Sequence, residues 1–154
     1  MKKAKIFSIS ILIPLLVGGL SALLTYKKTM VYSELNQPPL SPPMPVFGIV
    51  WTILFILMGI SCGMVYLKRA ETDVSAALKV YGFQLVLNFF WTIIFFNMGA
   101  YLFAFIWLLL ILVFVAVMIA QFYKISRAAA YLQIPYLLWL IFAGYLNIMI
   151  FILN

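Results

Sequence analysis

The stretch from Val80 to Tyr123 reads VYGFQLVLNFFWTIIFFNMGAYLFAFIWLLLILVFVAVMIAQFY, and none of its 44 residues is charged. As a single helix it would be roughly 66 Å long, at about 1.5 Å per residue. The hydrocarbon core of a bilayer is only about 30 Å thick. The stretch is therefore predicted to cross a membrane, to turn at the polar and flexible residues 97–100, and to cross back.

The composition of the whole chain is also typical of a membrane protein. Of its 154 residues, 68% are hydrophobic and 8% are charged, whereas water-soluble domains carry about 25% charged residues. The net charge of +7 comes from basic residues that lie in the gaps between apolar runs, where membrane proteins carry them, and that form no basic face. Nucleic-acid binding is therefore not expected.

Residues that usually bind metals or act as bases are scarce. The chain contains no histidine, which excludes His-ligated haem, histidine zinc sites and histidine general bases. Its single cysteine, Cys62, lies in an apolar run and is interpreted as a small buried hydrophobic residue. We expect neither a metal site nor a resident cofactor.

Five apolar runs are long enough to cross a bilayer. The predicted spans are residues 6–24, 46–67, 78–97, 101–123 and 129–153. The first run follows three lysines, as a signal peptide would, but it is long for one and has no clean cleavage site, so a retained helix is favoured. We predict an all-α fold, in which residues 1–154 form a single transmembrane domain, a bundle of five membrane helices.

The basic residues predict the orientation of this bundle. One side of the membrane receives eight of them and the other side only Lys27 and Lys28, so the positive-inside rule places the N-terminus in the cytoplasm and Asn154 outside a cell membrane. The eight residues are Lys2, Lys3, Lys5, Lys68, Arg69, Lys79, Lys124 and Arg127.

Residues 25–45 form the one long predicted loop, on the external side. Proline disfavours helix at its own position and at the residue before it, and this loop contains Pro38, Pro39, Pro42, Pro43 and Pro45. We expect a stiff, extended segment that acts as a lid over the external end of the bundle. A plain solvent-exposed connector is the alternative.

Small residues mark a place where helices can approach closely. Gly59 and Gly63 form a G-x-x-x-G spacing in the second span. The contact they predict lies either within the bundle or at a dimer seam.

Aromatic and amide side chains share helix faces in three of the spans. Spacings of three or four residues relate Phe47, Trp51 and Phe55 in the second span, Gln84, Asn88 and Trp91 in the third, and Trp139, Ala143 and Asn147 in the fifth. Two interpretations remain open: amides that pair between helices, or the walls of a ligand pocket. Because no acid or base lies in the interior of a span, a pocket here suits a large, planar, mostly apolar molecule, and neither ion coupling nor hydrolysis is expected.

Three motifs resemble those of a known family. They are PPLSPP at residues 38–43 followed by VFGIVWT at residues 46–52, then Gln84-x-x-x-Asn88-x-x-Trp91, then Pro135-Tyr136-x-x-Trp139-x-x-x-Ala143. In this order, and over nearly the whole chain, they resemble the translocator protein family, the tryptophan-rich sensory proteins or TspO, also called peripheral benzodiazepine receptors.

This resemblance implies a five-helix fold and binding of tetrapyrroles such as protoporphyrin IX and of benzodiazepine-type ligands. Some members are linked to light-dependent oxidative breakdown of protoporphyrin, and many are homodimers. Carried onto this chain, the ligand-binding residues would be Tyr32, Trp51, Phe55, Asn88, Phe90, Trp139, Ala143 and Leu146.

The chain departs from the family pattern at several positions. Val31 precedes Tyr32 where many relatives have a tryptophan, Gln37 stands where many have a basic residue, and Phe55 replaces a common tyrosine. No extension carrying the cholesterol motif of animal relatives follows Asn154, and the short form resembles bacterial members. Cholesterol binding is left open.

The hypothesis from the sequence is a porphyrin-binding protein of the bacterial plasma membrane. The macrocycle would stack between Trp51 and Trp139, with Asn88 hydrogen-bonded at its edge and Tyr32 covering it from the lid. The porphyrin would absorb light, oxygen would be the co-reactant, and both indoles would act as catalytic residues beside the excited ring. A tetrapyrrole transporter and a ligand-responsive sensor without catalysis are the alternatives.

Overall fold

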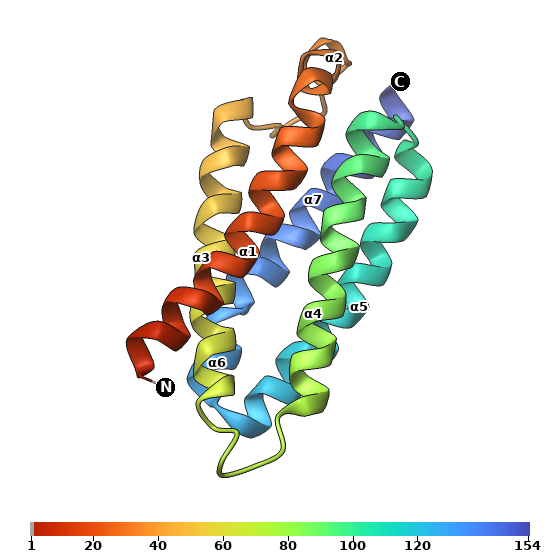
Figure 1. The fold of residues 1–154 in the computed structure, drawn as a ribbon. Helices are drawn as coiled ribbons and strands as arrows, with labels where there is room; N and C mark the ends of the chain where they lie inside the picture. Colours follow the sequence, from red (N-terminus) through yellow and green to blue (C-terminus); the bar gives the residue numbers. More distant parts are fainter. Residues whose placement is uncertain (1) are drawn as a thin grey trace.

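The computed structural model describes residues 2–154, and these form a helical bundle with no strand among them (Figure 1). The helices are α1 (Lys3–Thr25), η1 (Tyr26–Lys28), α2 (Thr29–Glu34), α3 (Met44–Tyr66), α4 (Ser75–Thr92), η2 (Ile93–Asn97), α5 (Tyr101–Ile125), α6 (Arg127–Leu132) and α7 (Ile134–Leu153). Five helical segments, the first, third and last made of more than one helix, are long and apolar enough to cross a membrane. The predicted all-α class and the five spans are confirmed.

The boundaries differ from the predicted ones by a few residues, for local reasons. Proline at the first turn starts α3 and α7, where its fixed φ suits a helix and its missing N–H is not needed. The fifth span, predicted as one run, breaks at Gln133, two residues before Pro135. Between the third and fourth spans, η2 ends at Asn97. The turn that follows contains Gly99 at φ +59°, a conformation that favours glycine.

The predicted extended loop at residues 25–45 is only half correct. Residues 26–34 are helical, as η1 and α2, and only residues 35–43 lack helix. The reason is that the prolines begin at Pro38 and restrict only themselves and their predecessors. From here on, residues 26–43 are called the lid.

The bundle has two ends, which differ in their connections. The lid, the turn at residues 97–100 and Asn154 lie at one end, and the N-terminus, the 67–74 loop and α6 lie at the other (Figure 1). All eight basic residues that set the predicted orientation belong to segments at the second end. We call these the lid end and the basic end.

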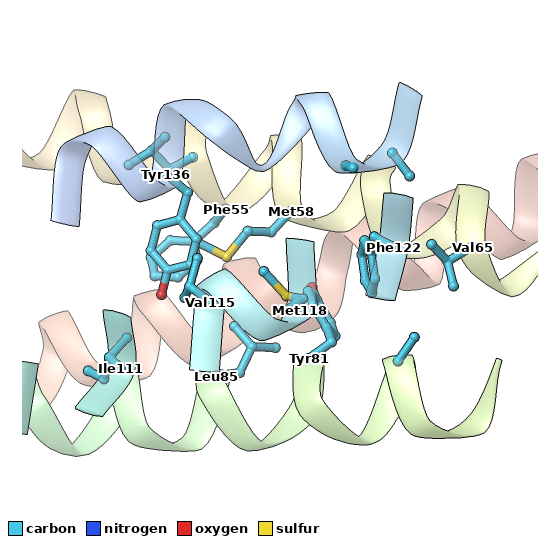
Figure 2. Packing of buried hydrophobic residues seen from close by; sticks show 14 of the residues in the cluster. Phe55, Met58, Val65, Tyr81, Leu85, Ile111, Val115, Met118, Phe122 and Tyr136 are labelled. Atoms are coloured by element: carbon cyan, nitrogen blue, oxygen red, sulfur yellow. The ribbon is translucent and has the colours of Figure 1, made fainter. Parts of the chain in front are cut away.

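The half of the bundle toward the basic end is a packed core. Side chains from α3, α4, α5 and α7 meet there (Figure 2). Those with almost no exposed surface include Met58, Val65, Val115, Met118, Phe122 and Tyr136. This core leaves the lid-end half as the place for a cavity.

Glycines bring α1 against α3 in this half. A Cβ at Gly59 would overlap the backbone of Ile11, and one at Gly63 would lie 2.7 Å from the Phe7 ring. The G-x-x-x-G spacing therefore serves a contact within the bundle, one of the two predicted possibilities.

Candidate functional site: a cavity beneath the lid

A cavity of about 390 Å³ lies between the lid and the packed core. Its walls come from α1, α3, α4, η2 and α7, and the lid closes over it. Ligand pockets for small molecules are commonly concave, largely apolar and fitted with a few directional polar groups. This cavity has that character, because no charged residue lines it.

Seven of the eight predicted ligand-binding residues line the cavity, which tests their position and not their role. They are Tyr32, Trp51, Phe55, Asn88, Trp139, Ala143 and Leu146. These residues come from the lid and from three spans, α3, α4 and α7, and the fold brings them to one place. Their contact with a ligand stays a prediction.

Phe90 is the exception, because the structure does not place it at the cavity. Its side chain is 45% exposed, and it does not line the cavity. With 3.6 residues per turn, a residue two positions beyond Asn88 lies on nearly the opposite face of the helix. Phe90 therefore points away from the interior. On the outside of the bundle its ring contacts that of Phe89, with ring centroids 5.3 Å apart.

The two site tryptophans contact each other. The ring centroids of Trp51 and Trp139 are 6.5 Å apart and the ring planes meet at 89°, an edge-to-face pair. The two rings leave no parallel gap between them, so the structure does not show the arrangement that the expected sandwich needs. A flat ligand would instead cover one side of the pair, where Phe55 is stacked on Trp51 at 5.6 Å.

A chain of buried hydrogen bonds orients Asn88. The Nδ2 of Asn88 donates to the Tyr136 hydroxyl at 2.9 Å, and that hydroxyl donates to Gln84 Oε1 at 2.7 Å. Gln84 and Tyr136 have 0% and 1% of their surface exposed. With Nδ2 engaged, Asn88 Oδ1 accepts no hydrogen bond from any residue in 2–154 and remains an acceptor at the cavity wall.

A second pair of polar groups joins α4 to α7 nearer the lid. The indole Nε1 of Trp91 donates to Asn147 Oδ1 at 3.1 Å, and Asn147 Nδ2 donates to the Tyr101 carbonyl at 2.8 Å. Trp91 and Asn147 line the cavity but were not assigned to the predicted site. The signal was in the sequence, since each shares a helix face with a residue that was assigned.

The wall formed by α1 was missed altogether. Gly18, Ser21 and Thr25 line the cavity at spacings of three and four residues, which is the pattern of one helix face. Ser21 Oγ donates to the Gly18 carbonyl at 2.9 Å and Thr25 Oγ1 to the Ser21 carbonyl at 2.8 Å. Because both hydroxyls are bonded within their own helix, this wall offers a ligand mainly apolar surface.

The lid is held over the cavity from two sides. On the inner side, the Tyr32 ring packs against Phe47, Phe95 and Phe96, with centroids 6.3, 5.6 and 5.5 Å away. On the outer side, Asn36 and Asn154 exchange hydrogen bonds, from Asn36 N to Asn154 Oδ1 at 3.0 Å and from Asn154 Nδ2 to the Asn36 carbonyl at 3.1 Å.

Two more bonds complete this attachment to α7. Asn36 Nδ2 donates to the Leu153 carbonyl at 3.2 Å, and the Tyr145 hydroxyl donates to the Pro39 carbonyl at 2.7 Å. We call these four hydrogen bonds the lid clasp. These bonds attach residues 36–39 to α7 and Asn154, whereas the choice between a lid and a plain solvent-exposed connector stays a prediction.

Comparison with known proteins gives one consistent result. The family model described as "TspO/MBR family" matches residues 10–153. A "Tryptophan-rich protein TspO" of Chlorobaculum tepidum is 37% identical over 126 residues, which cover 80% of this chain and 78% of that protein.

Two other relatives come from an archaeon and from cattle. A protein of the same name from Archaeoglobus fulgidus is 32% identical over 146 residues, 94% of each chain. The "Translocator protein" of Bos taurus is 34% identical over 118 residues, which cover 75% of this chain and 70% of that protein.

Proposed function

This chain belongs to the TspO/MBR family, and from that membership and the geometry of the cavity we propose that it binds a planar tetrapyrrole, metal-free protoporphyrin IX, inside the membrane. The observation that carries the proposal is an uncharged, aromatic cavity with one hydrogen-bond acceptor held in place at its wall. Flat aromatic surface favours a flat ligand, and an oriented acceptor gives that ligand a preferred direction.

The residues present suit a porphyrin without iron. Haem proteins hold iron through axial histidine, cysteine, methionine or tyrosine side chains. The sequence has no histidine, and its one cysteine, Cys62, does not line the cavity. The remaining residue types that ligate haem iron are represented in the cavity wall by Met44 at the start of α3 and by Tyr26 and Tyr32 in the lid. Within residues 2–154 no three His, Cys, Asp or Glu side chains gather as a metal site. Asn88 Oδ1 would accept a hydrogen bond from a pyrrole N–H only from above the face of the ring, because the N–H groups of a metal-free porphyrin point to its centre.

Charge at the lid end supports an orientation for the ligand. Acidic propionate groups are least costly to place near water and near cations. Tyr26 and Thr29 line the cavity, and Lys27 and Lys28 lie between them in η1 with exposed side chains. We place the propionates at this rim and the apolar part of the ring deeper, against Trp51.

Photochemistry is the finer part of the proposal. Bound porphyrin supplies the light absorption, and molecular oxygen is the co-reactant. Trp51 and Trp139 supply electron-rich indoles in contact with each other at the cavity wall, and one of them would contact the ring. In this proposal an indole reduces the excited porphyrin, the porphyrin anion passes that electron to oxygen, and the indole cation then takes an electron back from the ring. The porphyrin cation and the superoxide so formed combine to open the ring, so oxygen is the net oxidant and the indole is regenerated.

Binding is favoured over passage through the bundle. Transport through the centre of the bundle would require a path from the cavity to the basic end. That half is filled by Met58, Val115, Met118 and Tyr136, none with more than 1% of its surface exposed. A cell-membrane location with a cytoplasmic N-terminus, and a homodimer, stay predictions.

A fluorescence titration tests the proposal. Protoporphyrin IX added to the full chain in lipid nanodiscs should quench tryptophan emission with a saturable curve. Asn88→Ala should raise the Kd about twofold to tenfold, because one hydrogen bond contributes about 0.5–1.5 kcal/mol. Phe90→Ala, which removes a large aromatic ring outside the cavity, is the control and should leave the Kd unchanged.

Two results would contradict the proposal. One is a parent chain that porphyrin does not quench saturably. The other is a Kd that Phe90→Ala changes and Asn88→Ala does not. Uptake of porphyrin into sealed proteoliposomes, measured alongside, would favour the transport alternative.

A further inference from the structure

The cavity is closed toward water at the lid end. The four bonds of the lid clasp attach residues 36–39 to α7, and the Tyr32 ring is 6% exposed beneath them. The cavity is also closed toward the basic end by the packed core (Figure 2). A ligand that reaches it must open one of these ends or enter from the side.

The side between α1 and α3 is open. Gly19 and Ala22 of α1 and Gly48 and Thr52 of α3 line the cavity and are exposed on the outer surface. An ideal Cβ at Gly19 or at Gly48 would meet no atom within 4 Å. These four residues therefore border an opening that connects the cavity with the outer surface between α1 and α3. We call this opening the window.

The course of α1 explains the window. Toward the basic end α1 lies against α3, where Gly59 and Gly63 admit Ile11 and Phe7. Figure 1 shows α1 crossing α3 there and leaning away from it toward the lid end. Two rods that cross at one level must separate at another, so the contact at Gly59 and the gap at Gly48 have one geometric cause.

The window lies at membrane depth. Gly48 and Thr52 are four and eight residues into α3, which places them about 6 and 12 Å inside its start at about 1.5 Å per residue. Residues around the gap present large apolar side chains outward, among them Leu16, Leu20, Ile49 and Ile53. Such a surface suits acyl chains, so the window opens into lipid.

We propose that the cavity exchanges its ligand sideways with the bilayer, through the window between α1 and α3. The inference rests on the proposed function, since it assumes a planar apolar ligand, and it adds the source of that ligand: molecules already dissolved in the lid-end leaflet. The lid stays closed during exchange. The small residues at 19 and 48 determine the rate, because any larger side chain there would stand in the opening.

Rates of binding test this route. The full chain is reconstituted in phosphatidylcholine vesicles, mixed with vesicles that already contain protoporphyrin IX, and followed by tryptophan quenching. In a second series, the total lipid concentration is varied while the total porphyrin concentration is held constant. Sideways entry predicts an association rate that follows the porphyrin-to-lipid ratio.

Variants of the two window glycines give the decisive comparison. Gly19→Leu and Gly48→Leu should slow association and dissociation together by about tenfold, equivalent to a barrier about 1.4 kcal/mol higher, while the Kd changes little. Gly82→Leu is the matched control, because Gly82 also has open space around its Cβ but does not line the cavity. It should leave both rates unchanged.

A variant of the lid clasp separates the two routes. Asn154→Ala loosens the lid without touching the window, because the Asn154 side chain makes both reciprocal bonds to the Asn36 backbone. It should leave the association rate unchanged. The inference is overturned if Asn154→Ala speeds association while the window variants have no effect. It is also overturned if a window variant raises the Kd by speeding dissociation without slowing association, since that means lost contacts and not a blocked route. If the parent chain binds no porphyrin, the proposed function is overturned as well. If the parent binds porphyrin but Gly19→Leu and Gly48→Leu leave the association and dissociation rates unchanged, this inference alone is overturned.

Discussion

The indole of Trp51, in α3, meets the indole of Trp139, in α7, edge to face, with ring centroids 6.5 Å apart. The two rings form one continuous surface and do not face each other across a gap. In the proposed complex a planar ligand would therefore cover the pair from one side and contact one of the two rings. The Nε1 of Trp139 is buried and has no acceptor among residues 2–154, so replacing this residue removes an unsatisfied donor.

Replacing both indoles should separate photochemistry from folding. Trp51→Phe with Trp139→Phe keeps aromatic surface, so the protein should fold, but light-dependent loss of the porphyrin absorption band should stop. Affinity should fall about tenfold, since aromatic contacts contribute about 0.5–1.5 kcal/mol each. Trp107→Phe is the control, because Trp107 lies outside the cavity and donates to the Leu87 carbonyl. Unchanged bleaching and affinity in the double variant would rule out the role given to the pair.

Tyr136→Phe should destabilise the protein more than its size suggests. Without the hydroxyl, Asn88 Nδ2 and Gln84 Oε1 lose their partner in a buried site. Each unsatisfied group costs about 1–3 kcal/mol, which a lower unfolding midpoint in detergent would report. Tyr131→Phe, at a position with 58% of its surface exposed, is the matched control.

The same chain of bonds predicts non-additivity. Gln84→Leu added to Tyr136→Phe should cost less than the two single changes together, because it removes an acceptor that the first change left unpaired. Strict additivity would mean that the two side chains do not interact in the folded protein.

Gly59→Ala should lower stability although alanine is the better helix former. Its methyl group would overlap the Ile11 backbone and push α1 away from α3. Overpacking of this kind costs about 1–3 kcal/mol. Gly82→Ala, with open space at its Cβ, should instead gain up to about 1 kcal/mol from helix propensity. Equal unfolding midpoints for the two variants would contradict the close contact.

Asn154→Ala should loosen the lid. Its side chain makes both reciprocal bonds to Asn36 and a third to the Ile150 carbonyl. Losing about 1.4 kcal/mol of net hydrogen bonding would raise local opening about tenfold, which amide hydrogen exchange of residues 35–41 would report. Asn97→Ala, which removes a bond to the Leu24 carbonyl at the same end of the bundle, is the control. Protection unchanged by Asn154→Ala would mean that the clasp does not hold the lid.

Most of the site could be predicted because helix faces follow from spacing. Trp139 and Ala143 were placed in the cavity by spacing together with the family resemblance, and Asn88 likewise. Spacing also explains why Phe90 does not line the cavity, since a residue two positions after Asn88 lies on nearly the opposite face of the helix. The α1 wall escaped notice because Gly18 and Ser21 lack the large aromatic or amide groups by which the other walls were recognised.

The amino-acid sequence alone determined that this chain is a five-span helical membrane protein, and which faces of three helices carry rings and amides. Hydropathy and helical spacing act over a few residues, so they can be read without knowing what lies opposite. Only the tertiary structure decided that the two indoles touch, that Asn36 meets Asn154, and that α1 leaves α3 open at Gly48. Each of these joins residues far apart in the chain, and the angle at which helices cross, set by packing at Gly59, determines where the bundle closes and where it opens.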